Sequence, residues 1–261
     1  MTSVANVIDG INHAAYTSSR ARKEYGNSTR WHLLPEEQQV FRKILPQIRN
    51  RRILDIGIGG GRTTAFLLRV SPQYTGIDYS EKLIASAKKT FKAGTLLNCD
   101  VRDMRQFTDR SFDFAMFSFN GIDYLPHVGR IAALREIHRV LEPGGLFFFS
   151  SHNRDWKGVR QVPWRAPTLW SWPGLKRCIK ALLFLPRHLR MRRFEECADE
   201  YEILNDSGLE YRTLSYYISG PLQRLQLEYL GFTNIEAYGS HGLLSSQDTE
   251  SPYIHYLARK A

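Results

Sequence analysis

Glycines stand at alternate positions after an apolar run of the chain, at Gly57, Gly59 and Gly61. Glycine lets a ligand lie against the backbone because it has no side chain, and N–H groups at the start of a following helix point at that ligand. The dinucleotide fingerprint G-x-G-x-x-G needs glycine or alanine where this chain has Arg62. A tight turn without a ligand would use the same glycines. The pattern indicates a ligand site and disfavours NAD and FAD.

Polar side chains end the next four strands that the sequence predicts. Asp78 follows the glycine turn by about 20 residues, where a carboxylate can accept both ribose hydroxyl protons. Asp100 ends the next strand and can accept from an exocyclic amine. Asn120 and His152 follow the two strands after that. Acids at strand ends are also common turn formers. Four such ends in succession nevertheless favour a ligand that contains adenosine.

Alternating strands and helices from residue 52 on would bring these side chains to one edge of a sheet. Strands are expected at 52–57, 74–78, 95–100, 112–119, 146–150, 211–219, 234–238 and 253–259. Helices are expected at 35–48, 62–70, 80–91, 130–141 and 221–230. Residues 153–207 do not have the pattern of a sheet. The order predicts an α/β fold with a doubly wound, mostly parallel sheet.

Length and composition are those of one soluble α/β domain with an elaboration. The chain has 261 residues, of which 43% are apolar and 24% charged. We expect a cytoplasmic protein, because no apolar run approaches about 18–20 residues and the N-terminus has no signal-peptide core. The three cysteines are far apart and lack metal-ligand spacing, so we expect neither disulfides nor a zinc site.

The net charge of +10 comes from one segment of the chain. Between Arg154 and Arg193 there are eleven Lys and Arg residues and a single acid, Asp155, so this segment alone carries +10. Tryptophans stand among these basic residues, at 156, 164, 170 and 172. The rest of the chain is near neutral, and the basicity is therefore a local property.

Three interpretations of the basic segment remain open. The one we favour is a cap that binds an anionic or aromatic small molecule. Residues 176–193 mix leucines with bases, so they could instead form an interfacial helix or a partner-docking face, whose length Pro186 should limit. RNA binding is the third interpretation, since basic side chains can contact phosphates and aromatic side chains among them can stack on nucleobases. A solvated charged face without a role would have the same composition.

Five stretches of the chain resemble the class I S-adenosylmethionine (SAM)-dependent methyltransferases, in the branch of small single-domain enzymes. They are ILDIGIGGGRT, GIDYS, NCDVRDM, FDFAMFSFNGIDYL and EIHRVLEPGG, within about residues 50–150. The resemblance implies a seven-stranded sheet whose last strand is antiparallel, with SAM as the methyl donor. The basic, aromatic-rich insertion after strand five fills the place where such folds carry substrate-binding caps.

The resemblance also gives roles to residues that match by position. Gly57, Gly59 and Gly61 would line the methionine half of SAM. Asp55 would support the glycine turn, and Asn120 would lie near the reactive sulfonium.

The adenosine half would be held by the next two strand ends. Asp78 would bind the ribose and Tyr79 would lie beside the adenine. Asp100 together with Val101 would recognise the adenine edge. The resemblance to this family thus accounts for both acids that the strand pattern singled out.

The resemblance divides the chain into four parts. They are an N-terminal lid (1–34), the SAM-binding core (35–152), the cap (153–219) and a C-terminal completion of the sheet (220–261). In the lid, Tyr16 and Tyr25 would fold over the cofactor.

Candidate catalytic groups for methyl transfer are histidines and tyrosines near the same edge. His152 is the leading general base, because it follows strand five and titrates near neutrality. His127 and Tyr216 are further candidates, and His241 and Tyr217 could also face the acceptor. Each of these residues could equally be a packed, hydrogen-bonded side chain.

Several methyltransferase subclasses are disfavoured by missing motifs. We find neither the metal signature of cation-dependent catechol enzymes nor the Asn/Asp-Pro-Pro-Tyr/Phe motif of amino-methylating nucleic-acid enzymes, where this chain reads NGID from Asn120. The histidines favour oxygen over nitrogen as acceptor. We therefore expect a metal-independent methyltransferase that acts on a small molecule. Alternatives are an RNA-directed or membrane-associated methyltransferase that uses the basic segment, or a SAM-binding partner subunit without chemistry of its own.

Overall fold

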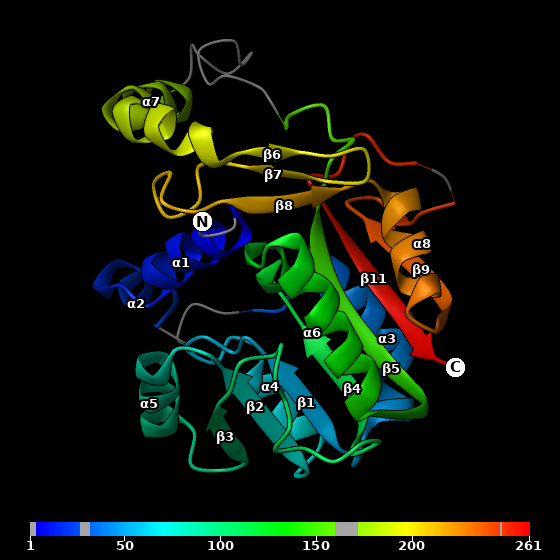
Figure 1. The fold of residues 1–261 in the computed structure, drawn as a ribbon. Helices are drawn as coiled ribbons and strands as arrows, with labels where there is room; N and C mark the ends of the chain where they lie inside the picture. Colours follow the sequence, from blue (N-terminus) through cyan, green and yellow to red (C-terminus); the bar gives the residue numbers. More distant parts are fainter. Residues whose placement is uncertain (1–3, 27–31, 160–171, 246) are drawn as a thin grey trace.

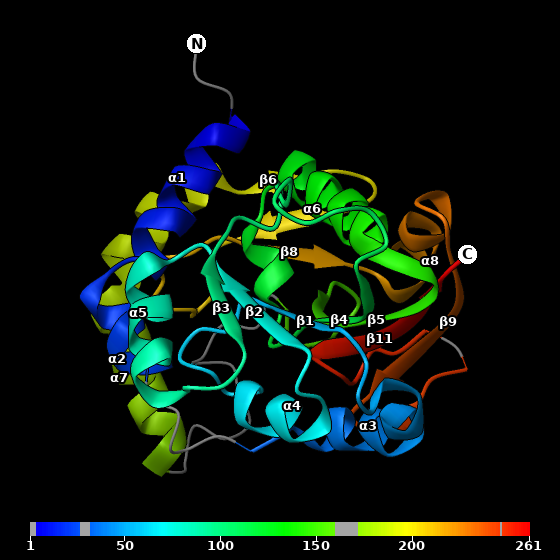
Figure 2. The ribbon, with the colours of Figure 1, turned by 90° about the horizontal axis from the view of Figure 1, so that it is seen from below.

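A mostly parallel β-sheet runs through the molecule, with helices on both faces (Figures 1 and 2). The computed structural model describes residues 4–26, 32–159, 172–245 and 247–261. The strands are β1 Ile53–Ile56, β2 Tyr74–Asp78, β3 Thr95–Asn98, β4 Phe112–Phe117, β5 Leu141–Asn153, β6 Glu196–Cys197, β7 Glu202–Leu204, β8 Ser215–Ile218, β9 Phe232–Gly239, β10 Gly242–Leu243 and β11 Tyr253–Lys260. The α-helices are α1 Val4–Tyr16, α2 Ser19–Tyr25, α3 Pro35–Ile48, α4 Thr64–Val70, α5 Glu81–Thr90, α6 His127–Val140, α7 Trp172–Met191 and α8 Gly220–Tyr229.

The strand order confirms the doubly wound α/β architecture. Its main path is β10-β9-β11-β5-β4-β1-β2-β3, and β11 is antiparallel to both of its neighbours, as expected for the last strand. The expectation of seven strands was too low, because the sheet has eleven in the described residues. Beyond those seven the sheet has β10 at one edge and β6 to β8 beyond the end of β5, of which only β8 was expected from the strand pattern, at 211–219.

Two hydrophobic layers cover the sheet and hold its strand ends in place. Phe41 of α3 and Leu67 of α4 pack on one face together with Phe148 of β5. Leu134 of α6 and Leu227 of α8 pack on the other face. The strands β4 and β5 are apolar on both sides, as strands between two helical layers must be.

The strand β5 is longer than the sequence suggested. We expected a helix to residue 141, a Pro-Gly-Gly turn and then a strand at 146–150, whereas α6 ends at Val140 and β5 continues to Asn153. The extension exists because the end of β5 pairs with β8, with His152 opposite Tyr217. The strand β8 is in turn shorter than the expected 211–219, since Tyr211 has a left-handed backbone with φ of 61°.

The insertion of residues 153–219 contains more regular structure than predicted. Its β6 and β7 form a hairpin that pairs with β8, so the expectation that 153–207 hold no sheet was wrong. The helix α7 continues through Pro186 to Met191, so this proline does not end it. Trp164 and Trp170, expected in the cap, lie outside the described residues.

The N-terminal helices α1 and α2 pack beside the insertion (Figure 1). Ile8 of α1 shares a small apolar cluster with Met191 and Tyr216. The buried side chain of Asn12 donates to the carbonyl oxygens of Tyr124 and Leu214, each at 2.8 Å, and accepts from Leu214 N–H at 2.9 Å. One amide therefore joins the N-terminal segment, the loop after β4 and the insertion.

Candidate functional site

The glycine turn after β1 has a backbone that only glycine adopts without strain. Gly57, Gly59 and Gly61 have φ of 66°, 55° and 95°. A Cβ on Gly57 would stand 2.8 Å from the ring of Phe117, and one on Gly61 would overlap the ring of Phe91. The three glycines are thus required by the geometry of the turn, with or without a ligand.

Asp55 lies beneath this turn and holds it to the sheet. Its Oδ2 accepts from the hydroxyls of Thr63 and Tyr74, each at 2.8 Å. Burial raises the pKa of Asp55 to about 6, although these two hydrogen bonds lower it. Its Oδ1 has no hydrogen-bond partner within the described part of the chain. The side chain is fully buried, so Asp55 acts on the turn rather than on a ligand.

Asp78 joins the glycine turn to the end of β2. Its two carboxylate oxygens accept from the backbone N–H groups of Gly59 (2.9 Å) and Ser80 (2.8 Å). Burial raises the pKa of Asp78 to about 6, against the lowering effect of these bonds. Two N–H groups leave further lone pairs of the carboxylate available. The side chain can therefore accept hydrogen bonds from a ligand in the neighbouring cavity.

Asp100, at the end of β3, is fixed by an arginine that the sequence did not single out. Arg102 Nε lies 3.0 Å from both oxygens of Asp100, and Arg102 Nη1 lies 2.8 Å from Asp9 Oδ1 of α1. Burial alone would raise the pKa of Asp100, but the bonds from Arg102 hold it below its usual value. The carboxylate is ionised at neutral pH, and the arginine ties the N-terminal helix to this strand end.

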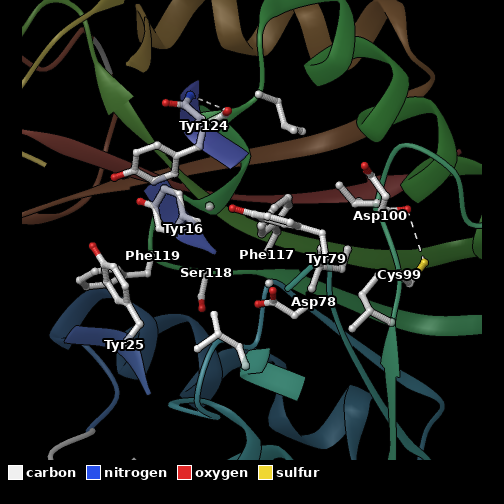
Figure 3. A pocket seen from close by; sticks show the side chains of 18 of the residues that line it. Tyr16, Tyr25, Asp78, Tyr79, Cys99, Asp100, Phe117, Ser118, Phe119 and Tyr124 are labelled. Carbon is white, nitrogen blue, oxygen red and sulfur yellow. Dashed lines mark hydrogen bonds between the residues drawn. The ribbon is translucent and has the colours of Figure 1, made fainter. Parts of the chain in front are cut away.

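A cavity of about 480 Å³ opens outside the carboxyl ends of β1, β2 and β4 (Figure 3). This volume falls within the roughly 300–1,000 Å³ that ligand pockets occupy. Seven of the expected cofactor residues line it: Tyr16, Tyr25, Gly57, Asp78, Tyr79, Asp100 and Val101. The four others, Asp55, Gly59, Gly61 and Asn120, do not line it. The cavity thus lies where the strand-end residues predicted a ligand.

Aromatic side chains cover the cavity from the N-terminal side. In Figure 3 the rings of Tyr16, Tyr25 and Tyr124 lie together at one end, Tyr79 and Asp78 lie in the middle, and Asp100 lies at the other end. Tyr16 has its ring centroid 5.7 Å from that of Tyr25 and 4.6 Å from that of Tyr124. Burial raises the pKa of Tyr25 to about 12, so its hydroxyl stays protonated at neutral pH.

Asn120 lies between residues that line the cavity and carries an unpaired buried oxygen. It has a left-handed backbone with φ of 56°, and its N–H donates to Ser150 Oγ at 2.9 Å. Its side-chain Oδ1 is buried without a hydrogen-bond partner among the described residues. Such an orphan acceptor beside Ser118 and Gly121, which do line the cavity, is what a ligand-binding site would leave unsatisfied.

His152 forms a buried pair with Asp123, a residue that the sequence analysis missed. Its Nδ1 lies 2.6 Å from Asp123 Oδ2, and its backbone N–H donates to the same oxygen at 2.6 Å. The His152 ring does not line the 480 Å³ cavity. Tyr124 lies between them, since it lines the cavity and its ring meets that of His152 edge-on with centroids 6.4 Å apart.

Asp123 is also the partner of a fully buried arginine. Arg130 Nη1 donates to Asp123 Oδ1, and Arg130 Nη2 donates to Ser151 Oγ at 3.1 Å and to Gln223 Oε1 at 2.5 Å. Both charged side chains are completely inaccessible. The network fixes Asp123 and through it the orientation of His152. Asp123 stands in the FNGIDYL stretch, where an acid two residues after a glycine could have signalled it.

Asp206 of the β7–β8 loop reaches the other nitrogen of His152. Its Oδ2 lies 3.8 Å from His152 Nε2 and accepts from the hydroxyl of Tyr217 at 3.1 Å. The rings of Tyr217 and Tyr253 lie 4.7 and 5.1 Å from the imidazole, centroid to centroid. The imidazole is thus enclosed by aromatic rings, with a second carboxylate from the insertion beside it.

His127 and Tyr216 lie together but away from this cluster. His127 Nδ1 is 2.9 Å from Tyr216 OH, and both rings stack with Tyr201. Burial lowers the pKa of His127, so its ring is neutral at pH 7. Neither residue lines the cavity. His241 is exposed in the turn after β9 and is not brought to the site either.

Arg62 stands where the dinucleotide-binding fingerprint would need glycine or alanine. Its side chain forms an ion pair at the edge of the cavity. Its Nη1 lies 2.7 Å from Glu37 Oε2, and its guanidinium lies over the Phe119 ring at 5.4 Å. Glu37 is fully buried, so this pair fixes the helix α3 against the start of α4. Among the residues that the structure describes, no group of three His, Cys, Asp or Glu side chains is placed to hold a metal ion.

Comparison with known proteins agrees with the fold. A family profile described as a methyltransferase domain matches residues 53–145. The ubiquinone biosynthesis O-methyltransferase of Coxiella burnetii (strain Dugway 5J108-111) is 29% identical over 123 residues, which are 46% of this chain and 49% of the relative. The demethylmenaquinone methyltransferase of Thermotoga maritima is 31% identical over the same shares. The chain thus spans about half the length of these relatives.

Solved structures extend the likeness to the whole fold. One is the 1,6-didemethyltoxoflavin-N1-methyltransferase of Burkholderia thailandensis, with bound 1,6-didemethyltoxoflavin and S-adenosylhomocysteine. It has a TM-score of 0.59 at 14% identity and covers 100% of this chain and 92% of its own. The fold, the glycine turn and the profile match define a Rossmann-like methyltransferase domain. Residues 53–145 are thus similar to a methyltransferase domain, and the chain as a whole has the fold of SAM-dependent methyltransferases of known structure.

Proposed function

We propose that the protein binds SAM in the 480 Å³ cavity and transfers its methyl group to an oxygen of a small-molecule acceptor. The observation that carries this proposal is the position of Asp78, whose buried carboxylate lines the cavity and is held by N–H groups on both sides. SAM, when bound, supplies a methyl group on a positively charged sulfur.

The residues that line the cavity suit the parts of this cofactor. The carboxylate of Asp78 would accept both ribose hydroxyls, and Asp100 would accept from the adenine amine beside Tyr79 and Val101. The glycine turn would bring its backbone against the methionine half. Asn120, which lies between the cavity-lining residues Phe119 and Gly121, would lie near the methyl-bearing end. The small volume and the two ionised carboxylates fit a compact ligand with a positive charge.

The N-terminal residues 1–34 would act as the lid. Tyr16 and Tyr25 line the cavity and are buried against Tyr124. Asn12 and the Arg102–Asp9 ion pair join the α1 helix to the rest of the site. A lid that closes over the cofactor would exclude water from the transferred methyl group.

The acceptor would lie beside Tyr124, with its reacting oxygen between His152 and the methyl-bearing end of the cavity. The contact of Asp123 with His152 Nδ1 orients the imidazole, and Nε2, which lies 3.8 Å from Asp206 Oδ2, would take the proton from an acceptor hydroxyl. The rest of the rate enhancement would come from alignment of this oxygen with the methyl carbon and the sulfur. His152 would act as the base and Asp123 would position it.

The enclosed surroundings of His152 favour an aromatic acceptor. The rings of Tyr124, Tyr217 and Tyr253 surround the imidazole, and flat aromatic faces suit stacking against another ring. The name of the Coxiella relative, an O-methyltransferase of ubiquinone biosynthesis, supports oxygen as the acceptor atom. The Burkholderia structure is that of an N1-methyltransferase, so the fold accommodates both chemistries.

A panel of paired acceptors would test the choice of oxygen. Matched phenols and anilines would be incubated with SAM and the protein, and methylated products would be measured by mass spectrometry. We expect methyl transfer to phenols and little to anilines of the same shape. Preferential methylation of the anilines would overturn the assignment of oxygen, while leaving SAM binding intact.

A further inference from the structure

The helix α7 carries a row of large apolar side chains that point into solvent. Six residues form this outer face of α7: Trp172, Leu175, Ile179, Leu182, Leu183 and Leu189, each at least 44% exposed. At about 100° of rotation per residue their six positions fall within about 120° of the helix circumference, so they lie on one side of the helix. The row is about 25 Å long at a rise of about 1.5 Å per residue.

The opposite side of α7 is anchored to the protein. Met191 is buried and packs in the cluster with Ile8 and Tyr216. Arg187 Nη1 donates to the carbonyl oxygen of Glu210 at 2.8 Å. The helix is therefore held in place through one face while its outer face is left without a partner in the described chain (Figure 1, top left).

The charged residues of the α7 segment itself have a single sign, although Glu195 and Glu210 from neighbouring segments pair with Arg192 and Arg187. Residues 172–193 contain seven Lys and Arg and no acidic residue. Among them Lys176, Arg190, Arg192 and Arg193 are exposed. A helix with an exposed apolar row and a cationic border has the composition of helices that lie in a membrane interface.

We propose that the outer face of α7 docks the protein onto an anionic lipid surface. The apolar row would enter the acyl boundary, and the cationic border would lie among negatively charged headgroups. This proposal does not depend on the methyl-transfer activity. It gives the basic segment a role distinct from binding the acceptor.

Other occupants fit the outer face less well. A second copy of the chain would bring two cationic helices together, and like charges at close range oppose such an interface. RNA would pair with the basic side chains but would leave the leucines and the isoleucine in water, since nucleic acids are bound through phosphates and base stacking. A lipid surface satisfies the charge and the apolar row together.

Vesicle sedimentation tests this proposal with the full chain. The protein would be mixed with vesicles of phosphatidylglycerol and phosphatidylcholine, and separately with phosphatidylcholine alone. We expect binding to the anionic vesicles that weakens as salt is added, and little binding to the neutral ones. The double substitution Leu182→Gln/Leu183→Gln should lower binding by at least about tenfold, because two exposed leucines no longer enter the lipid.

A matched control separates the outer face from general hydrophobicity. Leu225 on α8 is 58% exposed, so Leu225→Gln removes a comparable leucine elsewhere and should leave vesicle binding unchanged. Circular dichroism would verify that each variant is folded. Three results would overturn the proposal: no sedimentation with anionic vesicles at low salt, equal binding by the double variant, or a lipid-free dimer that the double variant converts to monomer.

Discussion

The backbone N–H of Gly60 donates to the carbonyl oxygen of Tyr25 across 3.0 Å, which places the end of α2 directly on the glycine turn. A Cβ at position 60 would stand 2.6 Å from that oxygen and 2.8 Å from the carbonyl carbon of Gly26. Neither neighbour can move alone, because both belong to the backbone. The N-terminal segment and the turn therefore share one contact surface.

Gly60→Ala should displace the N-terminal helices from the turn. We expect faster proteolysis within residues 1–34 and weaker SAM binding, because Tyr16 and Tyr25 lose their place at the cavity. Gly10→Ala is the control on the same segment, since a Cβ there meets nothing within 4 Å. It should be neutral or stabilising by up to about 1 kcal/mol. Equal protease resistance of the Gly60→Ala variant and the wild type would argue against the lid.

SAM affinity should fall as the pH is lowered through about 6. Burial raises the pKa of Asp78 to about 6, and only the ionised carboxylate can accept both ribose hydroxyls. Below that pH the affinity should drop by up to about tenfold per pH unit. Calorimetry between pH 7.5 and 5 measures this, and Asp78→Asn should bind weakly without the pH dependence. A constant affinity across the range would show that Asp78 does not act as a ligand.

The stability of the protein without cofactor should change in the opposite direction. The folded-state pKa values of Asp55 and Asp78, about 6, exceed the ordinary value of 3.8. Their contribution to stability is therefore complete below the unfolded pKa and is lost as the pH rises through about 6. At these two sites the folded state gains stability relative to the unfolded state as the pH falls from 7 to 5. Thermal unfolding of Asp55→Asn, which cannot ionise, should lack part of this gain.

Asp123→Asn should destabilise the protein strongly, because it leaves the charge of Arg130 buried without its partner. Loss of one member of such a pair costs about 3–5 kcal/mol. Urea unfolding measures the change. Asp103→Asn is the comparison, since Asp103 pairs with Arg105 at the surface and should have little effect. A small effect at both positions would mean that Arg130 finds compensation elsewhere.

His152→Gln should slow methyl transfer while leaving SAM affinity unchanged. The side chain lies behind Tyr124 and outside the cofactor cavity, so it can act only on the acceptor side. Loss of a general base typically lowers kcat by about 100- to 10,000-fold. His241→Gln serves as the control, because His241 is exposed in a distant turn. Unaltered turnover in the His152 variant would remove it as the base.

The cofactor side of the site was predictable because it depends on strand order. The carboxyl ends of parallel strands meet at one edge, so Gly57, Asp78 and Asp100 converge wherever the alternation of strands and helices is recognised. Their chemistry then followed from residue type. This rule did not predict that the last strand is antiparallel. That expectation came from the resemblance to known methyltransferases.

The acceptor side depends on contacts that no local pattern encodes. Asp123 and His152 are 29 residues apart in the sequence, and Asp206 approaches His152 from the insertion. No periodic pattern in the sequence therefore predicts either contact. His127 and Tyr216 were chosen by position, yet the alternation of side chains on β8 turns Tyr216 away from Tyr217. Pro186 did not end α7, because it lies on the exposed side, where water can bond the carbonyl left unpaired.

Isothermal titration of the full chain with SAM and with S-adenosylhomocysteine tests the central claim most directly. We predict one binding site for each ligand, and an affinity at least about 100-fold weaker in Asp78→Ala, which loses two hydrogen bonds to a charged group. Circular dichroism would establish that both proteins are folded. Absence of binding by the folded wild type, or equal affinity in the variant, would contradict the assignment of this cavity to SAM.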